Sequence, residues 1–230
     1  GGSPLGRLVE PEPFDLKKLG QWKDKLNISI SIPVYTLDGV KIALSMRSLS
    51  TFLHTAYVIG IRTMGSMLLG KKLAGIGGAL IGQLTFLALQ RNIPIWLNTP
   101  LVELISEGGE IKGVIVEKEG KRTELRARAV ILAAGGFPHN NEMRQKYHPH
   151  TITTDWTVAH KGNIGTAIQA GMAVGAATAL MDDAWWGPCF IDSKGVSQFM
   201  IWERSFPYSI IVDKSGKRFM NESASYVDCG

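Results

Sequence analysis

The stretch Ala129-Val-Ile-Leu-Ala-Ala-Gly-Gly-Phe137 decides how the rest of the chain is interpreted. Its apolar run, Val130 to Leu132, is typical of a short strand covered on both faces and predicts a buried strand. The two alanines and two glycines that follow carry little or no side chain. A bare backbone can approach a flat or phosphorylated ligand closely, and a tight strand-to-loop turn has the same composition. We expect one of these two structures here.

The residues before this stretch predict an antiparallel meander. Strand-like runs at 101–105, 111–117 and 123–128 are separated by Glu107-Gly-Gly-Glu110 and Glu119-Gly-Lys121. Short glycine-containing connections of this kind are typical of hairpins. The meander would deliver the chain directly into the glycine-ending stretch.

Four further segments are predicted to be helical. The clearest helix is 73–90, and we attribute the glycines at its start to close packing in preference to a ligand-binding terminus. Residues 48–69 predict a helix with apolar residues on more than one face, which should be well buried or packed against a partner. Residues 141–147 predict a short helix, and 162–180 a helix rich in small residues.

Composition excludes several classes of protein. The chain has 25 Lys and Arg against 20 Asp and Glu, a formal charge of +5, and its basic residues are scattered, so we expect no nucleic-acid surface. Two cysteines make no disulfide framework or zinc site and fit a reducing, cytoplasmic compartment. The apolar region 56–89 is interrupted by charges and glycines, which predicts no integral membrane segment. The oligomeric state is left open.

Three histidines, His139, His148 and His150, lie close together in the sequence. They lack a helical i, i+4 pair and clustered carboxylates, so we expect surface histidines and no metal site.

Four stretches in this order are similar to one family. The chain resembles a flavoprotein of the fumarate reductase and succinate dehydrogenase superfamily, and within it most closely the 3-ketosteroid 1-dehydrogenase branch, which Met181-Asp-Asp-Ala-Trp-Trp186 also supports. The stretches are Gly78-Ala-Leu-Ile-Gly-Gln-Leu84, Ala129 to Phe137, Gly162-Asn-Ile-Gly-Thr166 and Gly216-Lys-Arg-Phe-Met-Asn-Glu222.

The resemblance implies a mixed α/β (α+β) fold around FAD. Residues 1–160 would form the later part of a Rossmann-like FAD-binding domain with its antiparallel β-meander, and 161–230 the start of a substrate (capping) domain. No Gly-x-Gly-x-x-Gly unit follows a strand here, so the chain looks like an internal fragment whose full-length parent binds FAD.

The resemblance also assigns cofactor contacts. The strand around Val102 would lie by the adenine end of FAD, the alanine-glycine turn would line the cofactor, and the second glycine turn would approach it or the domain junction. The implied residues are Val102, Ala133, Ala134, Gly135, Gly136, Gly162 and Gly165. The family usually has Gly-Asp-Gly where this chain has Gly165-Thr-Ala167, which removes an acidic contact at Thr166.

Glu222 and Tyr226 are the catalytic candidates. Related dicarboxylate reductases usually place an arginine four residues after the glutamate, where this chain has Tyr226. A guanidinium pairs with a substrate carboxylate, whereas a phenol can act as a base when its pKa is lowered from about 10. The resemblance implies a tyrosine in this region as the proton acceptor of ketosteroid dehydrogenases, and a half-buried structural tyrosine is the alternative.

These features predict an FAD-dependent oxidoreductase of steroid metabolism acting on CH–CH groups. The expected reaction is 1,2-desaturation of a 3-ketosteroid-like ketone, with Trp185, Trp186 and Phe190 as a possible apolar wall. The first alternative is a fumarate reductase or succinate dehydrogenase-type subunit acting on a dicarboxylate. The second is a catalytically inert packing or interaction fragment.

Overall fold

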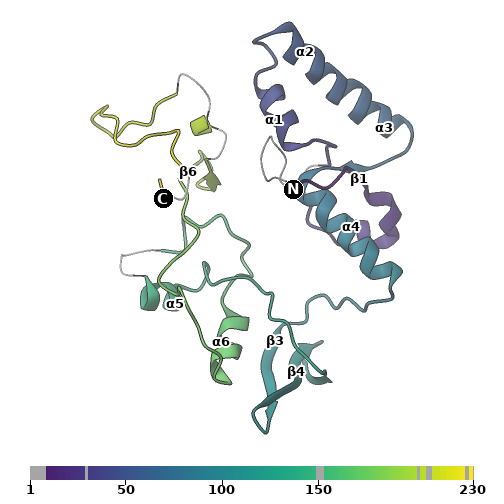
Figure 1. Cartoon of the computed structure of the whole chain (residues 1–230), viewed down its shortest axis with the longest axis vertical. Coiled ribbons are helices and arrows are strands. Elements are labelled where there is room, and N and C mark those ends of the chain that lie inside the picture. Colours follow the sequence, from purple (N-terminus) through teal and green to yellow (C-terminus); the bar gives the residue numbers. More distant parts are fainter. Residues whose placement is uncertain are drawn as a thin grey trace. The chain divides into compact units, whose positions relative to one another are not determined.

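The computed structural model describes residues 9–28, 31–148, 153–200, 203–205, 209–225 and 228–229 (Figure 1). The chain divides into two compact units, Gly1–Trp96 (unit 1) and Leu97–Gly230 (unit 2). This division reflects packing, and the functional domain boundary at residue 160 stays a prediction. Within the described part of the chain, no helix is long and apolar enough to cross a membrane.

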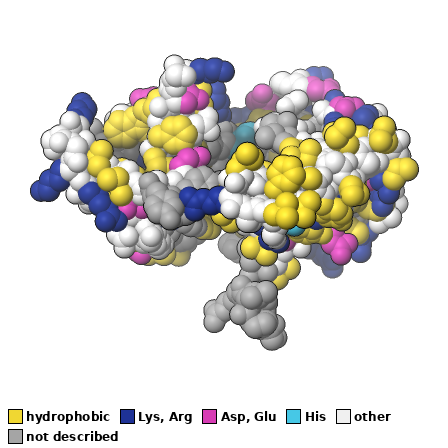
Figure 2. Space-filling model, turned by 90° about the horizontal axis from the view of Figure 1, so that it is seen from above, with side chains coloured by type: hydrophobic (Ala, Val, Ile, Leu, Met, Phe, Trp, Pro, Cys, Tyr) yellow, Lys and Arg dark blue, Asp and Glu magenta, His cyan; other side chains and the backbone are white. Residues whose placement is uncertain are grey.

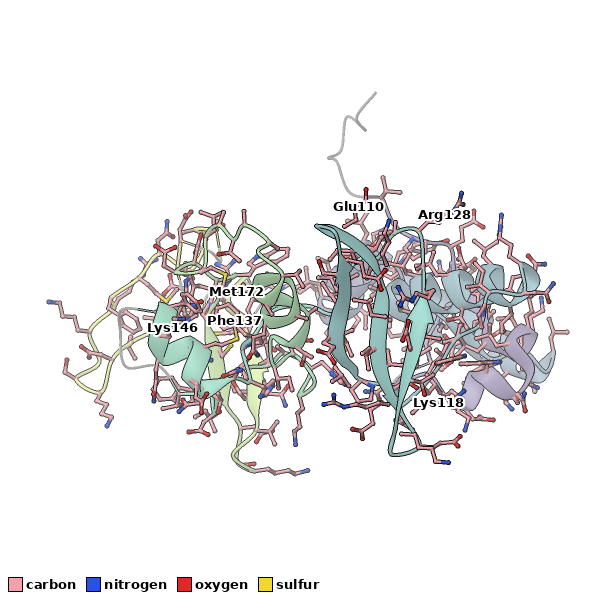
Figure 3. All side chains as sticks on the ribbon, turned by 90° about the horizontal axis from the view of Figure 1, so that it is seen from below. Glu110, Lys118, Arg128, Phe137, Lys146 and Met172 are labelled. Atoms are coloured by element: carbon pink, nitrogen blue, oxygen red, sulfur yellow. The ribbon has the colours of Figure 1, made fainter. Side chains whose placement is uncertain are left out.

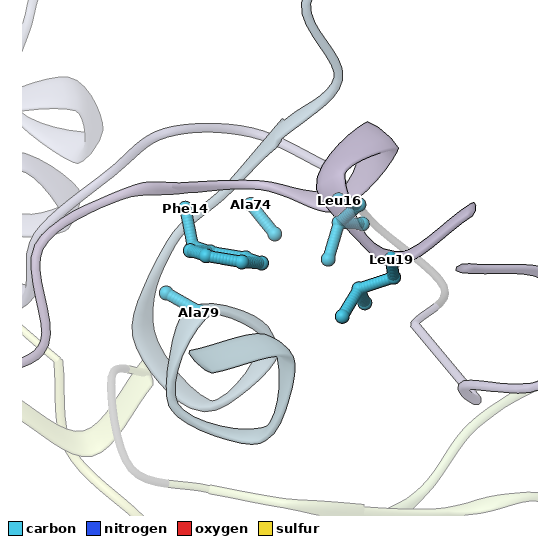
Figure 4. Packing of buried hydrophobic residues seen from close by; sticks show 5 residues of the cluster. All are labelled: Phe14, Leu16, Leu19, Ala74 and Ala79. Atoms are coloured by element: carbon cyan, nitrogen blue, oxygen red, sulfur yellow. The ribbon is translucent and has the colours of Figure 1, made fainter. Parts of the chain in front are cut away.

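The core of unit 1 lies on one face of helix α4 (Ile76–Gln90). Strand β1 (Phe14–Asp15) pairs antiparallel with β2 (Leu73–Ala74), and the 3-10 helix η1 (Leu16–Asp24) follows β1. The buried side chains that pack there are Phe14, Leu16, Leu19, Ala74 and Ala79 (Figure 4).

Glycines at α4 make this packing possible. A Cβ at Gly82 would lie 2.8 Å from the Phe14 ring, and one at Gly75 would lie 2.2 Å from the Val34 carbonyl oxygen. A Cβ at Gly78 would lie 3.2 Å from that of Ala74. The prediction that the glycines at the start of this helix serve packing is therefore confirmed for Gly75 and Gly78, whereas a Cβ at Gly77 would meet no described atom within 4 Å.

The remainder of unit 1 is helical. Helix α1 (Thr36–Ala43) precedes an unbroken run of α2 (Leu49–Ala56), the π-helical η2 (Tyr57–Met64) and α3 (Gly65–Leu68). Ser48 caps this run by accepting a hydrogen bond from the Thr51 N–H. The predicted helix at 48–69 is confirmed. Of the two alternatives expected for its apolar residues, burial within the chain does not hold, since Leu68 is 88% exposed, and packing against a partner stays a prediction.

Unit 2 begins with the meander. Strands β3 (Leu101–Glu107), β4 (Glu110–Lys118) and β5 (Lys121–Arg126) pair antiparallel in sequence order. Both hairpin turns contain left-handed residues, with φ of +59° and +80° at Gly108 and Gly109 and of +52° and +74° at Glu119 and Gly120. Turns of this hand match the twist of the paired strands, so the sequence signal and the structure agree. Figure 3 shows Glu110 and Lys118 at the two ends of β4.

The predicted buried strand at 130–132 is wrong. Residues 130–132 form no regular element, no described residue forms a ladder hydrogen bond with them, and Ile131 is 89% exposed. A strand requires a neighbouring strand to satisfy its N–H and C=O groups, and the described residues provide none beside this stretch. The apolar run alone does not make a strand.

The rest of unit 2 carries short elements. Helix α5 (Asn141–Tyr147) matches its prediction, whereas α6 (Thr166–Ala173) covers only part of the predicted 162–180. Helix α6 ends because Gly175 takes a φ of +85° and the Ala176 N–H bonds back to Gly171 O at 3.0 Å, a common C-terminal stop. A small hairpin, β6 (Cys189–Ile191) with β7 (Ser197–Phe199), and the 3-10 turn η3 (Glu203–Ser205) follow.

Truncation of the core leucine tests the packing of unit 1. Leu16 is 1% exposed, so Leu16→Ala should lower the free energy of unfolding by about 2–5 kcal/mol through lost burial and a residual cavity. The matched control, Leu37→Ala, removes a side chain that is 68% exposed and should change stability by less than about 0.5 kcal/mol. Denaturant titration of the chain measures both, and equal losses would show that this cluster is not the core.

Candidate cofactor site

The two glycine turns singled out in the sequence lie against each other. The Gly165 N–H donates to the Gly136 carbonyl at 3.0 Å, and the His139 N–H donates to the Asn163 carbonyl at 3.0 Å. These two bonds join residues far apart in the sequence. The structure therefore brings the predicted contacts Gly135 and Gly136 together with Gly165.

One side chain links the second glycine turn to helix α5. The Asn140 Oδ1 accepts a hydrogen bond from the Met143 N–H at 3.0 Å and so caps α5. The Asn140 Nδ2 donates to the Ile164 carbonyl at 2.9 Å, within the second glycine turn. Sequence reasoning missed this role, although an asparagine just before a helix is a capping signal.

Glycine is required where the turns touch. Gly135 and Gly165 have φ of +74° and +78°, a region that disfavours other residues. A Cβ at Gly135 would lie 2.7 Å from Asn163 Oδ1, and one at Gly165 would lie 2.6 Å from Met143 Sδ. A Cβ at Gly165 would also lie 2.9 Å from the Phe137 Cβ, directly after the first turn, so a side chain there would strain the contact between the turns.

The solvent side of the first turn is bare and apolar. Ala133 to Gly136 are exposed, and a Cβ at Gly136 would meet only Pro138, at 3.7 Å. A shallow hollow beside it is lined by Leu101, Val114, Leu132, Ala133, Ala134 and Ala167. Bare main chain beside an apolar wall suits a flat ring system or a ligand that approaches the backbone, so the residues present fit a dinucleotide such as FAD.

The other two predicted cofactor residues are Val102 and Gly162. Val102 is half-buried on β3, at a register shift in its pairing with β4. Gly162 is exposed, and its N–H donates to His160 Nδ1 at 3.0 Å. No described contact joins either residue to the bare turn.

Aromatic rings pack around Phe137, the residue that follows the first turn. Phe137 is buried, with its ring 5.8 Å from that of Tyr147 and 5.6 Å from that of His148. Trp186 meets the other side of His148 edge-on at 5.3 Å. Helices α5 and α6 flank a groove here, with Lys146 and Met172 lining it (Figure 3).

The prediction of a surface histidine at His148 is wrong. The residue is 7% exposed, and burial, together with the nearby Arg144 guanidinium, lowers its pKa below the usual 6.5. Burial also lowers the pKa of Arg144, whose Nη1 donates to the Pro138 carbonyl at 3.3 Å. His139 is half-buried, with Nε2 2.9 Å from the Ala159 carbonyl oxygen, and His150 lies outside the described residues. Sequence spacing could not show the rings that enclose His148.

Glu222 is a buried anchor. Its Oε1 accepts a hydrogen bond from the Ile211 N–H at 2.7 Å, and its Oε2 accepts one from Arg218 Nη2 at 2.5 Å. The Arg218 guanidinium and then the Ile211 N–H lower the pKa of Glu222 to about 2, so the carboxylate is ionised at neutral pH. Arg204 adds Nη1 bonds to the carbonyls of Glu222 and Ala224 at 2.7 and 2.6 Å.

The arrangement around Glu222 holds the chain that leads to the second catalytic candidate. Tyr226 lies outside the described residues. An ionised carboxylate already paired with Arg218 is a poor proton acceptor, and its geometry instead fixes the segment just before Tyr226. The i, i+4 spacing of Arg218 and Glu222 is the sequence signal that could have indicated this ion pair.

The depressed pKa of Glu222 has a consequence for acid stability. A carboxyl whose pKa falls on folding stabilises the native state above its unfolded pKa of about 4.5, and this contribution disappears as the pH falls toward about 2. We expect Glu222→Gln to lower the melting temperature at neutral pH and the difference from the unmodified chain to vanish near pH 2. Glu119→Gln, in an exposed turn, should show no such pH-dependent difference. A constant difference across the series would contradict this assignment.

Comparison with known proteins agrees with this geometry. The chain matches the family described as FAD binding domain over residues 2–230. It is 44% identical, over 239 aligned positions and 99% of its length, to the 3-oxosteroid 1-dehydrogenase of Mycobacterium tuberculosis, and 41% identical to that of Mycolicibacterium smegmatis. The chain spans 42% of the length of these curated relatives.

More distant relatives and a solved structure give the same result. The chain is 32% identical to the fumarate reductase (cytochrome) of Shewanella frigidimarina over 65% of its length and 26% of that protein. It superimposes with a TM-score of 0.86, at 30% identity, on the 3-ketosteroid delta1-dehydrogenase of Sterolibacterium denitrificans in complex with 1,4-androstadiene-3,17-dione, covering 97% of this chain and 43% of that one. The predicted fold class, the predicted family resemblance and FAD as the cofactor are confirmed. The chain belongs to the FAD binding domain family.

Proposed function

We propose that the full-length protein carrying this chain is an FAD-dependent dehydrogenase that introduces a 1,2 double bond into a 3-ketosteroid-like substrate. The observation that carries the proposal is the 44% identity to a 3-oxosteroid 1-dehydrogenase across nearly the whole chain. The contact between the two glycine turns also supports it, because a backbone without projecting side chains allows the cofactor to approach closely. The proposed location is cytoplasmic.

The residues that would hold FAD come mainly from the two turns. Ala133 to Gly136 offer main chain without projecting side chains, and Gly165 supports them through its bond to the Gly136 carbonyl. Val102 on β3 and Gly162 are the further proposed contacts. When bound, FAD supplies the acceptor for a hydride that leaves the substrate carbon.

Tyr226 is the proposed base. A ketone acidifies the C–H bond next to it, and a phenolate at Tyr226 would take that proton while the neighbouring carbon loses hydride, so that a conjugated double bond remains. The Glu222–Arg218 pair would position this tyrosine by fixing the preceding chain. Exposed Trp185 and Phe190 would offer apolar surface to a flat substrate, and Trp186 is already engaged with His148.

The rival is reduction or oxidation of a dicarboxylate, which the similarity to a fumarate reductase favours. A dicarboxylate requires a fixed cation, and Tyr226 stands where an arginine is expected. The isolated 230-residue chain could itself be inert, because it spans under half of its relatives.

Removal of one phenol tests the mechanism. We expect Tyr226→Phe in the full-length protein to lower kcat for steroid-dependent reduction of an artificial dye by at least about a hundredfold, since general-base catalysis contributes about 10²–10⁴. The control, Tyr147→Phe, removes a phenol whose hydroxyl reaches only Met172 Sδ, at 4.0 Å, among the described contacts, and should leave turnover nearly unchanged. Full activity of Tyr226→Phe, or activity with fumarate and none with 3-ketosteroids, would contradict the proposal.

A matched pair of glycines tests the cofactor site. Gly165→Ala should reduce bound flavin per protein by about tenfold or more, because the added Cβ would lie 2.9 Å from the Phe137 Cβ and strain the contact between the two turns. Gly175→Ala carries the same backbone strain, with φ of +85°, but its added Cβ meets no atom of the described residues within 4 Å, so this variant should retain its flavin. Visible absorbance of the purified full-length proteins measures this. Equal amounts of bound flavin in both variants would show that cofactor binding does not depend on the contact at Gly165.

A further inference from the structure

The ring of His148 joins two aromatic residues that lie far apart in the sequence. Its centroid is 5.6 Å from that of Phe137 and 5.3 Å from that of Trp186. Aromatic rings attract one another at such distances. Phe137 directly follows the bare turn proposed to hold FAD, and Trp186 directly follows Trp185, proposed to face the substrate. The histidine therefore connects the cofactor side of unit 2 with the substrate side.

The backbone around Trp185 forms a tight turn. The Trp186 N–H donates to the Ala184 carbonyl at 2.9 Å, so Trp185 is the middle residue of a three-residue turn, here called the tryptophan turn (184–186). A Cβ at Gly187 would lie 2.3 Å from the Phe199 ring, so strand β7 packs closely against the chain just after this turn. The contacts of Trp186 and Gly187 thus determine where Trp185 is presented.

Exposure of Trp185 does not by itself mark a functional residue. Hydrophobic side chains are exposed at several places on this chain (Figure 2). Exposed apolar residues are common on protein surfaces and require no special explanation. Trp185 differs because its neighbour Trp186 packs against a buried ring.

A histidine is a costly residue in this enclosure. His148 is 7% exposed, and neither of its ring nitrogens completes a hydrogen bond with a described residue. Buried polar atoms without partners cost free energy, and a phenylalanine ring would fill the same space without that cost. A local rule is often broken in this way where a residue serves function. Packing alone therefore does not explain histidine at this position.

The surroundings of His148 favour its uncharged form. Burial and the Arg144 guanidinium lower its pKa below the usual 6.5, although the Asp183 main chain and the exposed carboxylates of Asp182 and Asp183 act in the opposite direction. The ring is therefore uncharged at neutral pH and gains a proton only as the pH falls below about 6.5. That proton would place a second cation beside Arg144, which is itself 6% exposed. Because two buried cations repel each other, protonation favours movement of the ring toward water.

We propose that uncharged His148 is a positioning residue for the reaction, because it fixes the tryptophan turn against Phe137 and so sets the place of Trp185 relative to the cofactor turn. Protonation of the ring releases the tryptophan turn and weakens the binding of a steroid-like substrate. The inference rests on the proposed function, since it gives Trp185 a contact with the substrate. His148 acts through Trp186 and is not itself a catalytic residue.

The pH dependence of substrate binding by the full-length protein tests the proposal. With 4-androstene-3,17-dione as the 3-ketosteroid, we expect the KM of the unmodified protein to rise by at least about fivefold from about pH 7.5 to about pH 5.5, as His148 gains its proton. His148→Phe keeps a ring that cannot be protonated, so its KM should change by less than about twofold. The change in kcat should be the same in both proteins, since both retain Tyr226.

Two further variants complete the comparison. His54→Gln removes a histidine of unit 1 whose Nε2 lies 2.7 Å from Asp38 Oδ1, and a glutamine amide can still donate to that carboxylate. Its KM should rise in acid as in the unmodified protein. His148→Ala removes the ring and should raise KM by at least about fivefold even at neutral pH, whereas His148→Phe restores the aromatic contacts and a low KM.

Near-UV circular dichroism gives a readout that does not depend on turnover, because it reports the fixed packing of aromatic side chains. The tryptophan signal of the unmodified protein should fall over the same pH range, and in His148→Phe and Trp186→Phe it should not. The proposal is overturned if His148→Phe keeps the pH dependence of the unmodified protein, or if the unmodified protein shows none. Absence of 3-ketosteroid turnover in the unmodified protein would instead overturn the proposed function, and circular dichroism would still decide whether His148 fixes Trp186.

Discussion

The hydrogen bond from the Gly165 N–H to the Gly136 carbonyl is the constraint on which the candidate site depends. It holds Gly165 where a Cβ would lie 2.9 Å from the Phe137 Cβ, which explains glycine at that position, whereas a Cβ at Gly136 would meet only Pro138 among the described residues, at 3.7 Å. Asn140 adds a second connection by capping α5 and binding the Ile164 carbonyl. Loss of either contact would free the bare turn from its support, while the meander and α6 could remain intact.

Elements with a local cause could be predicted from the sequence. The meander is specified by its glycine turns, and α5 by an asparagine cap and a short periodic run, so both lie close to their predicted bounds. Helix α6 is shorter than the predicted 162–180 because Gly175, with a φ of +85°, ends it. An element can be predicted from the sequence when the residues that determine it lie close together in the chain.

Features with a distant cause could not be predicted in this way. Val130 to Leu132 has the composition of a strand, but composition cannot supply the partner strand that its backbone needs. His148 is buried because Phe137 and Trp186, far apart in the sequence, enclose it. The hydrogen bond between the two glycine turns could not be predicted either, because the turns are brought together only by folding. The family resemblance indicated each turn separately.

The meander has a consequence for the order in which unit 2 assembles. Its three strands are joined by tight turns, so every pairing connects residues close in the sequence and closes only a small loop. Contacts of this kind cost little chain entropy and form rapidly. We therefore expect β3 to β5 to be structured while the later residues are still being synthesised, leaving the Ala129 to Phe137 stretch tethered at the edge of a formed sheet when α6 emerges to meet it.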